Sequence, residues 1–398
     1  MNLAELLRRA AETHGERPAV SDGFGLHQNY RALAARAARL ARALRERFGL
    51  RPGETVGIVM SNQPAYLEIL FGCWQAGLAA VPVNAKLHAR EIAWILDNAE
   101  ARLCFVSAEL AEAVAPLVAV LDRLSTVVVA ASTEYERLFR FDGMAPERAV
   151  TPDTLAWLFY TSGTTGRPKG AMLSHRNLMR MIVNYFADVD QIGPGECIIH
   201  AAPLSHGSGL YGLPHLAKGA NQVIPDSRGF DPAECLSLIG HYPGASFFFA
   251  PTMVQRLAVA ATREKVATSN LKTIVYGGGP MYVADLLRAI EVFGPKFVQI
   301  YGQGEAPMTI TGLPKWMHAD TADPRYLERL GSAGPARTDV EVMVVGEDDR
   351  PLGVGEVGEV ICRGDVVMQG YWRNPKASAE TLRGGWLHTG DMGSFDAE

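Results

Sequence analysis

Short apolar runs alternate with longer amphipathic stretches over the first third of the chain. Runs of four to six apolar and β-branched residues predict strands, and apolar positions repeating every three or four residues predict helices. The expected strands are Thr55–Met60, Ala79–Val83, Leu103–Val106 and Thr126–Val129, and the expected helices between the early ones are Ala65–Gln75 and Arg90–Asp97. This alternation is typical of βαβ units and indicates a parallel sheet.

The same pattern returns after residue 150 and then changes. Further strands are predicted at Cys197–Ala201, Gln222–Ile224, Ser246–Phe249, Thr273–Tyr276 and Phe297–Tyr301. From Gly331 onward, alternating VEVMVV, a GEDD turn and the glycine-rich GVGEVGEVICRG predict antiparallel strands. We therefore expect an α/β fold: two doubly wound, mainly parallel sheets with packed helices plus a small antiparallel β-barrel-like subdomain. The expected boundaries are 1–150, 151–330 and 331–398.

Charge and cysteine content narrow the class of function. The 398 residues include 38 Lys plus Arg against 43 Asp plus Glu, a net charge of −5, which gives no electrostatic case for nucleic acid. A small-molecule ligand is the better expectation. The five cysteines are odd in number and form no CxxC pair, which disfavours both a disulfide framework and a zinc site. We expect buried thiols in a reducing cytoplasm.

No segment of the chain has the pattern of a membrane span. The N-terminus lacks the apolar core of a signal peptide, and the most apolar region, residues 69–83, is interrupted by Gln75, glycines and Pro82. The expectation is a soluble protein without a transmembrane segment. An amphipathic stretch at Tyr30–Phe48 carries arginines on its polar face, which fits either a solvated surface helix or adsorption to a membrane.

The stretch FYTSGTTGRPKGAMLSH, from Phe159 to His175, concentrates candidate ligand-binding groups. Apolar runs on either side predict that a loop joins two strands, with Ser174 capping a following helix. A Walker A loop is excluded, because Lys169 is followed by Gly170 instead of Ser or Thr. Glycine backbone, hydroxyl donors and a lysine still suit a polyphosphate. The alternative is a flexible hydrophilic turn. The candidate residues are Thr161, Ser162, Gly163, Thr164, Thr165, Gly166 and Lys169.

This loop resembles the signature loop of the adenylate-forming enzymes, a superfamily of acyl-CoA synthetases, amino-acid adenylation domains and firefly luciferase. Four further blocks resemble that family in the same order: YGGGP from Tyr276, QIYGQGE from Gln299, GEVICRGDVVMQGYW from Gly358 and GWLHTGD from Gly385. Together the five motifs extend over most of the chain. The resemblance implies that ATP and Mg²⁺ are bound and that a carboxylate is activated.

The resemblance also implies where the nucleotide binds. Predicted strand ends place His206, Ala250, Gly277 and Tyr301 at one cleft, as ligand sites in open parallel sheets require. By resemblance the adenine site comprises Gly278, Gly279, Pro280, Tyr301, Gly302 and Gln303. By resemblance, Asp391 is the ribose ligand and Glu305 the metal ligand. A carboxylate can accept hydrogen bonds from the two ribose hydroxyls and can supply an oxygen ligand to Mg²⁺. Taken singly, these residues also fit a structural turn beside a core tyrosine, a surface glutamate and a turn aspartate.

The implied reaction joins a carboxylate to the α-phosphate of ATP and then passes the acyl group to a thiol. Lys169, Glu305 and His206 are the predicted catalytic residues, and His206, Gly207, Ala250 and Gly277 are the predicted acid-binding residues. His206 also fits a packing role.

No aspartate lies between Ala201 and Leu210 to hold an amino acid's ammonium group, which favours a plain fatty or aromatic acid with CoA as acceptor. A carrier-protein acceptor and a non-catalytic nucleotide-binding module are the alternatives, and a homodimer is left open.

Two features depart from the family pattern. Gly304 stands where the family's YGxTE motif has threonine, so a hydroxyl contact to phosphate or carboxylate is missing. Only Met392–Glu398 follow Asp391, whereas in the family a hinge and a small C-terminal domain with a catalytic lysine come next. We therefore expect these 398 residues to be the N-terminal domain, able to bind nucleotide and acyl-adenylate but to form adenylate very slowly and CoA ester hardly at all.

Overall fold

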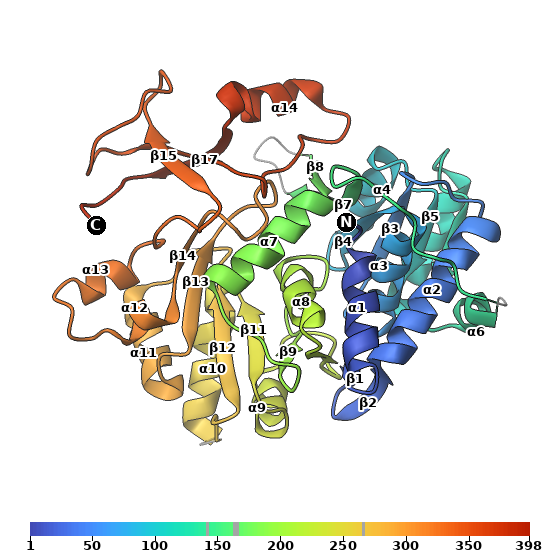
Figure 1. Ribbon diagram of the computed structural model, residues 1–398, viewed down its shortest axis with the longest axis horizontal. Coiled ribbons are helices and arrows are strands. Elements are labelled where there is room, and N and C mark those ends of the chain that lie inside the picture. Colours follow the sequence, from blue (N-terminus) through green and yellow to red (C-terminus); the bar gives the residue numbers. More distant parts are fainter. Residues whose placement is uncertain (141–142, 162–166, 265–266) are drawn as a thin grey trace.

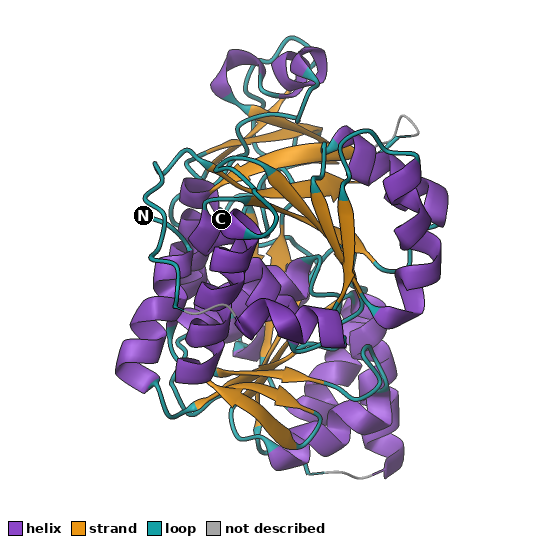
Figure 2. Ribbon diagram, turned by 90° about the vertical axis from the view of Figure 1, so that its right-hand side faces the viewer, coloured by secondary structure: helices purple, strands orange, loops and turns teal. Residues whose placement is uncertain are grey.

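The computed structural model describes residues 1–140, 143–161, 167–264 and 267–398. Figure 1 shows the N-terminal part of the chain on the right, a second sheet on the left, and the C-terminal strands above that second sheet. Figure 2 shows helices packed on both sides of the large sheets. The arrangement confirms the α/β fold that the alternation of apolar and amphipathic segments predicts.

The first large sheet contains the early predicted strands and the two strands next to the phosphate loop. Its order is β6-β5-β3-β4-β7-β8, parallel except for the last pair, β7 and β8. Every residue of β3 is buried, as expected of a strand covered on both faces. The bounds are β3 (Thr55–Met60), β4 (Ala79–Asn84), β5 (Leu103–Val106), β6 (Thr126–Val129), β7 (Leu155–Thr161) and β8 (Lys169–Ser174).

The second large sheet has the order β14-β13-β12-β11-β9-β10-β1-β2, with a parallel centre and antiparallel edges. Its edge strands β2 and β14, and β1 next to β2, were not predicted. Residues 18–29 belong to this sheet although they precede residue 150, and residues 155–174 belong to the first sheet although they follow it. The predicted domain boundaries at 150 and 330 stay a prediction. The bounds are β1 (Pro18–Asp22), β2 (Gly25–Asn29), β9 (Cys197–Ile199), β10 (Asn221–Ile224), β11 (Ala245–Phe249), β12 (Leu271–Tyr276), β13 (Phe297–Tyr301) and β14 (Thr311–Leu313).

The C-terminal segment forms the small antiparallel sheet that its alternating pattern predicts. The order is β15-β16-β17, with β15 (Glu341–Val345), β16 (Gly358–Arg363) and β17 (Leu387–Gly393). Residues 370–372, between β16 and β17, pair with β8 of the first sheet through backbone hydrogen bonds from Met172 to Gly370 and from Trp372 to Gly170. This pairing brings the C-terminal segment next to Lys169, where the Tyr371 ring lies beside the ammonium group.

The core extends across both large sheets and buries the apolar faces of the helices. Helix α3 is buried everywhere except at Gln75. Helix α2 buries Leu33, Leu40 and Leu44 completely, so its apolar face belongs to the core, as the surface-helix interpretation requires. The main helices are α1 (Ala4–His14), α2 (Tyr30–Glu46), α3 (Ala65–Ala76), α4 (Ala89–Asn98), α7 (His175–Asp188), α8 (Gly207–Ala217), α9 (Pro232–His241), α10 (Pro251–Glu264), α11 (Val283–Phe293), α12 (Lys315–Ala319), α13 (Tyr326–Leu330) and α14 (Pro375–Thr381).

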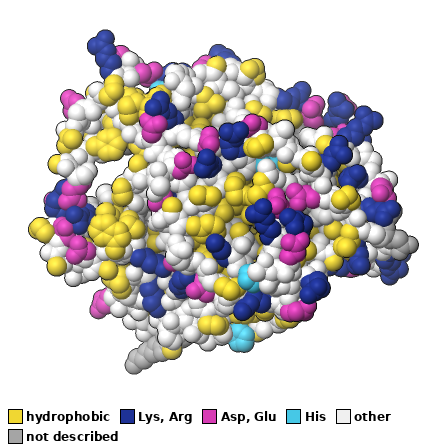
Figure 3. Space-filling view, in the orientation of Figure 1, with side chains coloured by type: hydrophobic (Ala, Val, Ile, Leu, Met, Phe, Trp, Pro, Cys, Tyr) yellow, Lys and Arg dark blue, Asp and Glu magenta, His cyan; other side chains and the backbone are white. Residues whose placement is uncertain are grey.

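The surface mixes charges of both signs. On the face shown in Figure 3, basic and acidic side chains are interspersed with hydrophobic ones. In the described part of the chain, no helix has the length and hydropathy needed to cross a membrane.

Candidate active site

A pocket of about 500 Å³ opens where strands β12 and β13 end. It is lined by residues 278–280, which follow β12, and by residues 299–302 at the end of β13. Asp391, from β17 of the small sheet, also lines it. The structure therefore brings together six residues that the sequence analysis assigned to the nucleotide: Gly278, Gly279, Pro280, Tyr301, Gly302 and Asp391.

Asp391 is held in place from the end of β13. The Tyr301 hydroxyl donates a hydrogen bond of 2.7 Å to Asp391 Oδ2, and Gln303 Nε2 donates one of 2.8 Å to the same oxygen. Gln303 Nε2 also donates to the carbonyl oxygen of Thr389 at 2.9 Å. Burial, together with the neighbouring carboxylate, raises the pKa of the Tyr301 phenol, which keeps it a neutral donor. The sequence predicted Tyr301 as an aromatic face and missed this second use of its hydroxyl.

A second group of predicted residues meets at the described ends of the phosphate loop. Thr161, the last residue of β7, pairs with Lys169, the first residue of β8. The Thr161 hydroxyl donates to Glu305 Oε1 at 3.2 Å. Residues Ser162, Gly163, Thr164, Thr165 and Gly166, also predicted to contact phosphate, lie outside the described residues.

Tyr371 connects this group, and the sequence analysis assigned it no role. Its hydroxyl donates to Glu305 Oε1 at 2.7 Å, and the Lys169 ammonium lies 5.1 Å from the centre of its ring. Both distances fit real interactions, a charge-assisted hydrogen bond and a cation–π contact. Tyr371 belongs to the GYW block that resembles the family. The motif therefore marked this residue but did not identify Glu305 and Lys169 as its partners.

Glu305 has the features of a cation ligand. Its side chain is only 8 % exposed, and among the described residues no lysine, arginine or histidine forms an ion pair with it. A buried carboxylate without a cation is costly, and hard oxygen ligands are those that Mg²⁺ prefers. The surroundings of Glu305 therefore fit a magnesium ion, with Thr161 and Tyr371 orienting the carboxylate.

His206, which the sequence analysis assigned to the acid, contacts strand β7. It precedes helix α8, and its Nδ1 atom lies 2.9 Å from the hydroxyl oxygen of Ser205, which fixes the ring orientation. Burial lowers the pKa of His206, so the neutral ring is favoured. The ring meets Phe159 of β7 edge-on, with the ring centres 5.3 Å apart. The sequence did not predict Phe159 as part of this site.

The remaining predicted acid-binding residues lie along the adjoining strand ends. Gly207 begins α8 and lies against the ring of Phe248 on β11. Ala250 follows β11, and the Gly277 amide after β12 donates to the carbonyl oxygen of Phe249 at 3.1 Å. Strand pairing between β11 and β12 thus links these residues to the pocket at the ends of β12 and β13.

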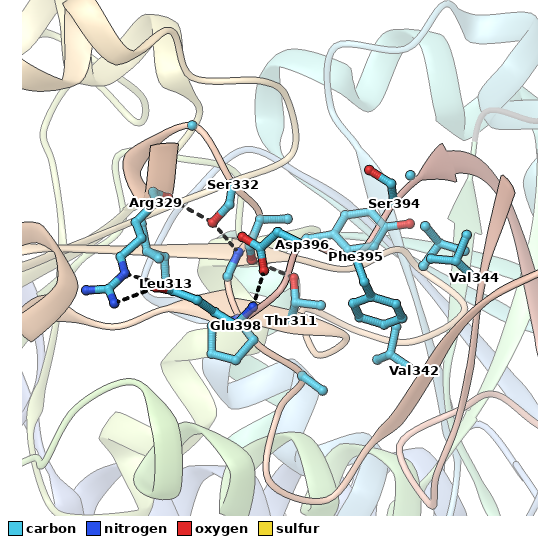
Figure 4. A pocket seen from close by; sticks show the side chains of 18 of the residues that line it. Thr311, Leu313, Arg329, Ser332, Val342, Val344, Ser394, Phe395, Asp396 and Glu398 are labelled. Atoms are coloured by element: carbon cyan, nitrogen blue, oxygen red, sulfur yellow. Dashed lines mark hydrogen bonds and ion pairs between the residues drawn. The ribbon is translucent and has the colours of Figure 1, made fainter. Parts of the chain in front are cut away.

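A larger cavity of about 830 Å³ adjoins the pocket at the ends of β12 and β13 and shares Tyr301, Gly331, Ser332, Ala333 and Asp391 with it. Figure 4 shows Phe395 beside Val342 and Val344 of the small sheet, with Glu398 reaching Arg329 on α13. Arg329 Nε donates to Glu398 at 2.9 Å. This cavity lies between the second sheet and residues 392–398, and it contains none of Lys169, Glu305 and His206.

Comparison with known proteins decides the family. Residues 7–372 match the model of the AMP-binding enzyme family. The chain belongs to this family. Feruloyl-CoA synthase from Amycolatopsis sp is 38% identical over 94% of this chain and 72% of that protein. Fatty acid–[acyl-carrier-protein] ligase ScoC from Streptomyces coeruleorubidus is 31% identical over 93% of this chain and 70% of that protein.

A solved structure matches the whole fold. The crystal structure of the N-terminal domain of FACL13 from Mycobacterium tuberculosis has a TM-score of 0.88 and 23% identity, covering 100% of this chain and 98% of that one. At this identity the likeness shows the fold. The relatives place this family member in the acyl-CoA synthetase branch, whose members are AMP-forming acid–thiol ligases.

Proposed function

We propose that this enzyme activates an aromatic carboxylic acid with ATP and transfers the acyl group to CoA. The observation that carries the proposal is the hydrogen bond from Thr161 to Glu305, which holds the end of the phosphate loop against the segment after β13. Phe159 lies two positions earlier on the same strand and contacts His206. The nucleotide side and the acid side of the proposed site therefore meet along β7.

Each predicted residue has a place in this proposal. Adenine packs against the pocket at the ends of β12 and β13, and ribose binds Asp391, which Tyr301 and Gln303 orient. Lys169 and the loop residues before it contact the phosphates. When Mg²⁺ is bound with ATP, it neutralises phosphate charge, and Glu305 would hold it.

The proposed chemistry needs positioning and electrostatic stabilisation more than covalent catalysis. A carboxylate oxygen attacks the α-phosphorus and pyrophosphate leaves; the thiol sulfur of CoA then attacks the acyl carbonyl carbon and AMP leaves. Lys169 stabilises the negative charge that builds on the phosphate oxygens. His206, neutral and oriented by Ser205, borders the acid's carboxyl group.

The proposal of an aromatic acid rests on two supports. Feruloyl-CoA synthase, whose named acyl group is aromatic, is 38% identical, whereas the long-chain-fatty-acid–CoA ligase of Salmonella typhimurium is 29% identical. The side chains next to His206 and Gly207 are the aromatic rings of Phe159 and Phe248. A carrier-protein acceptor is the second candidate, favoured by the likeness to ScoC.

The test measures adenylate formation, acceptor and binding separately. Purified protein is given MgATP and a panel of aromatic and fatty acids, with hydroxylamine to trap acyl-adenylate, in the presence and absence of CoA. Calorimetry measures affinity for sulfamoyl-adenosine conjugates, which mimic acyl-adenylates but do not react. We expect tight binding of aromatic conjugates. Faster thioester formation on a carrier protein than on CoA would favour the second candidate, and ATP binding without any conjugate binding would favour a non-catalytic module.

Two further properties belong to the proposal. A cytoplasmic location is supported by the five cysteines, all of which are buried free thiols. A homodimer is proposed from the sequence alone, and sedimentation equilibrium at micromolar concentration tests it.

A further inference from the structure

Gly304 lies where a side chain would collide with strand β7. A Cβ atom at this position would lie 2.5 Å from Phe159 Cδ1 and 2.5 Å from Thr161 Cγ2. Carbon atoms in contact are normally about 3.5–4.0 Å apart. Even alanine at 304 therefore requires Phe159 or Thr161 to move. Both side chains point to the same face of β7, because they are two residues apart on one strand.

The backbone of β7 cannot easily yield to such a side chain. Phe159 pairs with Ala171 and Thr161 with Lys169 across the β7–β8 ladder, and Trp157 pairs with β4 on the other side. Strand β7 is therefore paired with β8 at Phe159 and Thr161 and with both neighbours at Trp157, so a change of side-chain rotamer is the smaller adjustment. A rotation of Thr161 would break its hydrogen bond to Glu305, and a rotation of Phe159 would remove its ring from His206.

A second glycine has the same relation to a second phenylalanine ring. A Cβ atom on Gly207, the residue after His206, would lie 2.3 Å from Phe248 Cε1. Phe248 in turn meets Tyr211 edge-on, with ring centres 5.9 Å apart. Phe159 therefore lies beside His206, and Phe248 lies beside Gly207. Each ring occupies space that a side chain at a glycine would need, Gly304 for Phe159 and Gly207 for Phe248.

We propose that Phe159 is a specificity-determining residue that favours planar aromatic acids, and that Gly304 is a positioning residue that leaves room for its ring. This inference rests on the proposed function, since it assumes that the acid lies beside His206. A conjugated ring gains an edge-to-face or offset contact with Phe159, whereas an alkyl chain gains only apolar contact. On this proposal, the absence of a side chain at position 304 leaves the space that the Phe159 ring occupies.

The experiment compares an aromatic and an aliphatic acyl-adenylate mimic on the full 398-residue chain. Calorimetry gives the affinities of wild type and Phe159→Leu for the sulfamoyl-adenosine conjugates of ferulic and decanoic acid, and for ATP. Leucine keeps apolar bulk but removes the ring. We expect affinity for the ferulic conjugate to fall about three- to tenfold, while the decanoic conjugate and ATP change less than twofold. Phe186→Leu is the control: this partly buried ring on α7 contacts Lys218, and the affinity ratio should not change.

Gly304 is tested by substitution and rescue. Gly304→Thr should weaken both conjugates and lower the melting temperature. Adding Phe159→Ala to Gly304→Thr removes the collision with the ring but not the one with Thr161 Cγ2, so it should recover part of the decanoic binding but not the preference for the ferulic conjugate. Equal weakening of both conjugates by Phe159→Leu, or no weakening, overturns the specificity role. A Gly304→Ala variant that melts and binds like wild type overturns the positioning role. Wild type that binds ATP but neither conjugate instead refutes the proposed function itself.

Discussion

Replacing Gln303 by leucine tests whether Asp391 must be held rigidly for the nucleotide to bind. The change removes two hydrogen bonds from Gln303 Nε2, one of 2.8 Å to Asp391 Oδ2 and one of 2.9 Å to Thr389. The Tyr301 bond to Asp391 remains. A hydrogen bond to a charged group contributes about 1.5–3 kcal/mol, and the exposure of Asp391 favours the low end. We therefore expect ATP affinity to fall about tenfold.

The assay separates a ribose effect from a general loss of binding. Titrations measure ATP and inorganic tripolyphosphate, which has no ribose, at fixed magnesium and neutral pH. Gln303→Leu should weaken ATP and leave tripolyphosphate unchanged. Gln255→Leu is the matched control, because Gln255 donates a similar amide–carboxylate bond of 2.6 Å to Asp285 between α10 and α11, away from the pocket. This control should change neither affinity.

Two results would refute the reasoning about Gln303. Equal weakening of ATP and tripolyphosphate would place the effect at the phosphates instead of the ribose. Unchanged ATP affinity would mean that the bond from Tyr301 alone orients Asp391, or that Asp391 does not bind ribose. Titrating Tyr301→Phe in the same way separates these two explanations, since it removes the other bond to Asp391.

Four further predictions concern single substitutions in the site and in the core. Tyr371→Phe removes the donor to Glu305 but keeps the ring beside Lys169, so the free energy of unfolding in urea should fall by about 1–2 kcal/mol; no change would deny that this bond stabilises the fold. Glu305→Gln should move the magnesium dependence of ATP binding to higher concentration, and an unaltered magnesium curve would exclude Glu305 as the ligand. Lys169→Ala should weaken ATP with little effect on melting, and unchanged ATP affinity would remove it from the phosphate site. Burial lowers the pKa of His200 to about 4, below 6.5 in the unfolded chain, so the unfolded chain binds more protons and stability falls as pH drops from 6.5 to 4. Between these two pH values, this group changes the free energy of unfolding by about 1.4 kcal/mol per pH unit. His200→Gln should remove this contribution, so the number of protons taken up on unfolding in this range should fall by about one.

The pattern of apolar residues predicted those strands that carry their own signal. Thr55–Met60, Leu103–Val106 and Thr126–Val129 are apolar runs inside one sheet, and the structure gives them the predicted bounds. Strands β1 and β2 carry no such signal, because their sequences, PAVSD and GLHQN, are short and partly polar. They become strands through pairing: β1 lies parallel to β10, about 200 residues later in the chain. Local periodicity cannot report a partner so distant.

The same distinction applies to the candidate site. The motifs contain residues that line the pocket at the ends of β12 and β13, since residues 278–280 and 299–302 are each contiguous in sequence. They did not reveal that Tyr371 connects Glu305 with Lys169, because that contact depends on residues 370–372 pairing with β8. Nor did they reveal that Gln303 and Tyr301 share one carboxylate oxygen of Asp391. Each missed role depends on a contact between segments that are far apart in the chain.

Gly304 shows most clearly why a departure from a motif needs a structure to interpret it. From the sequence, glycine in place of threonine is a lost hydroxyl. In the structure, the space that a side chain at position 304 would need is already occupied by Phe159 and Thr161. Packing then makes positions 159 and 304 interdependent, because a β-branched side chain at 304 and a phenylalanine at 159 cannot both be accommodated on an unmoved β7. Family members with threonine at the equivalent of 304 should therefore have a smaller or differently oriented side chain at the equivalent of 159, and a threonine paired with an unmoved phenylalanine ring in a solved relative would contradict this coupling.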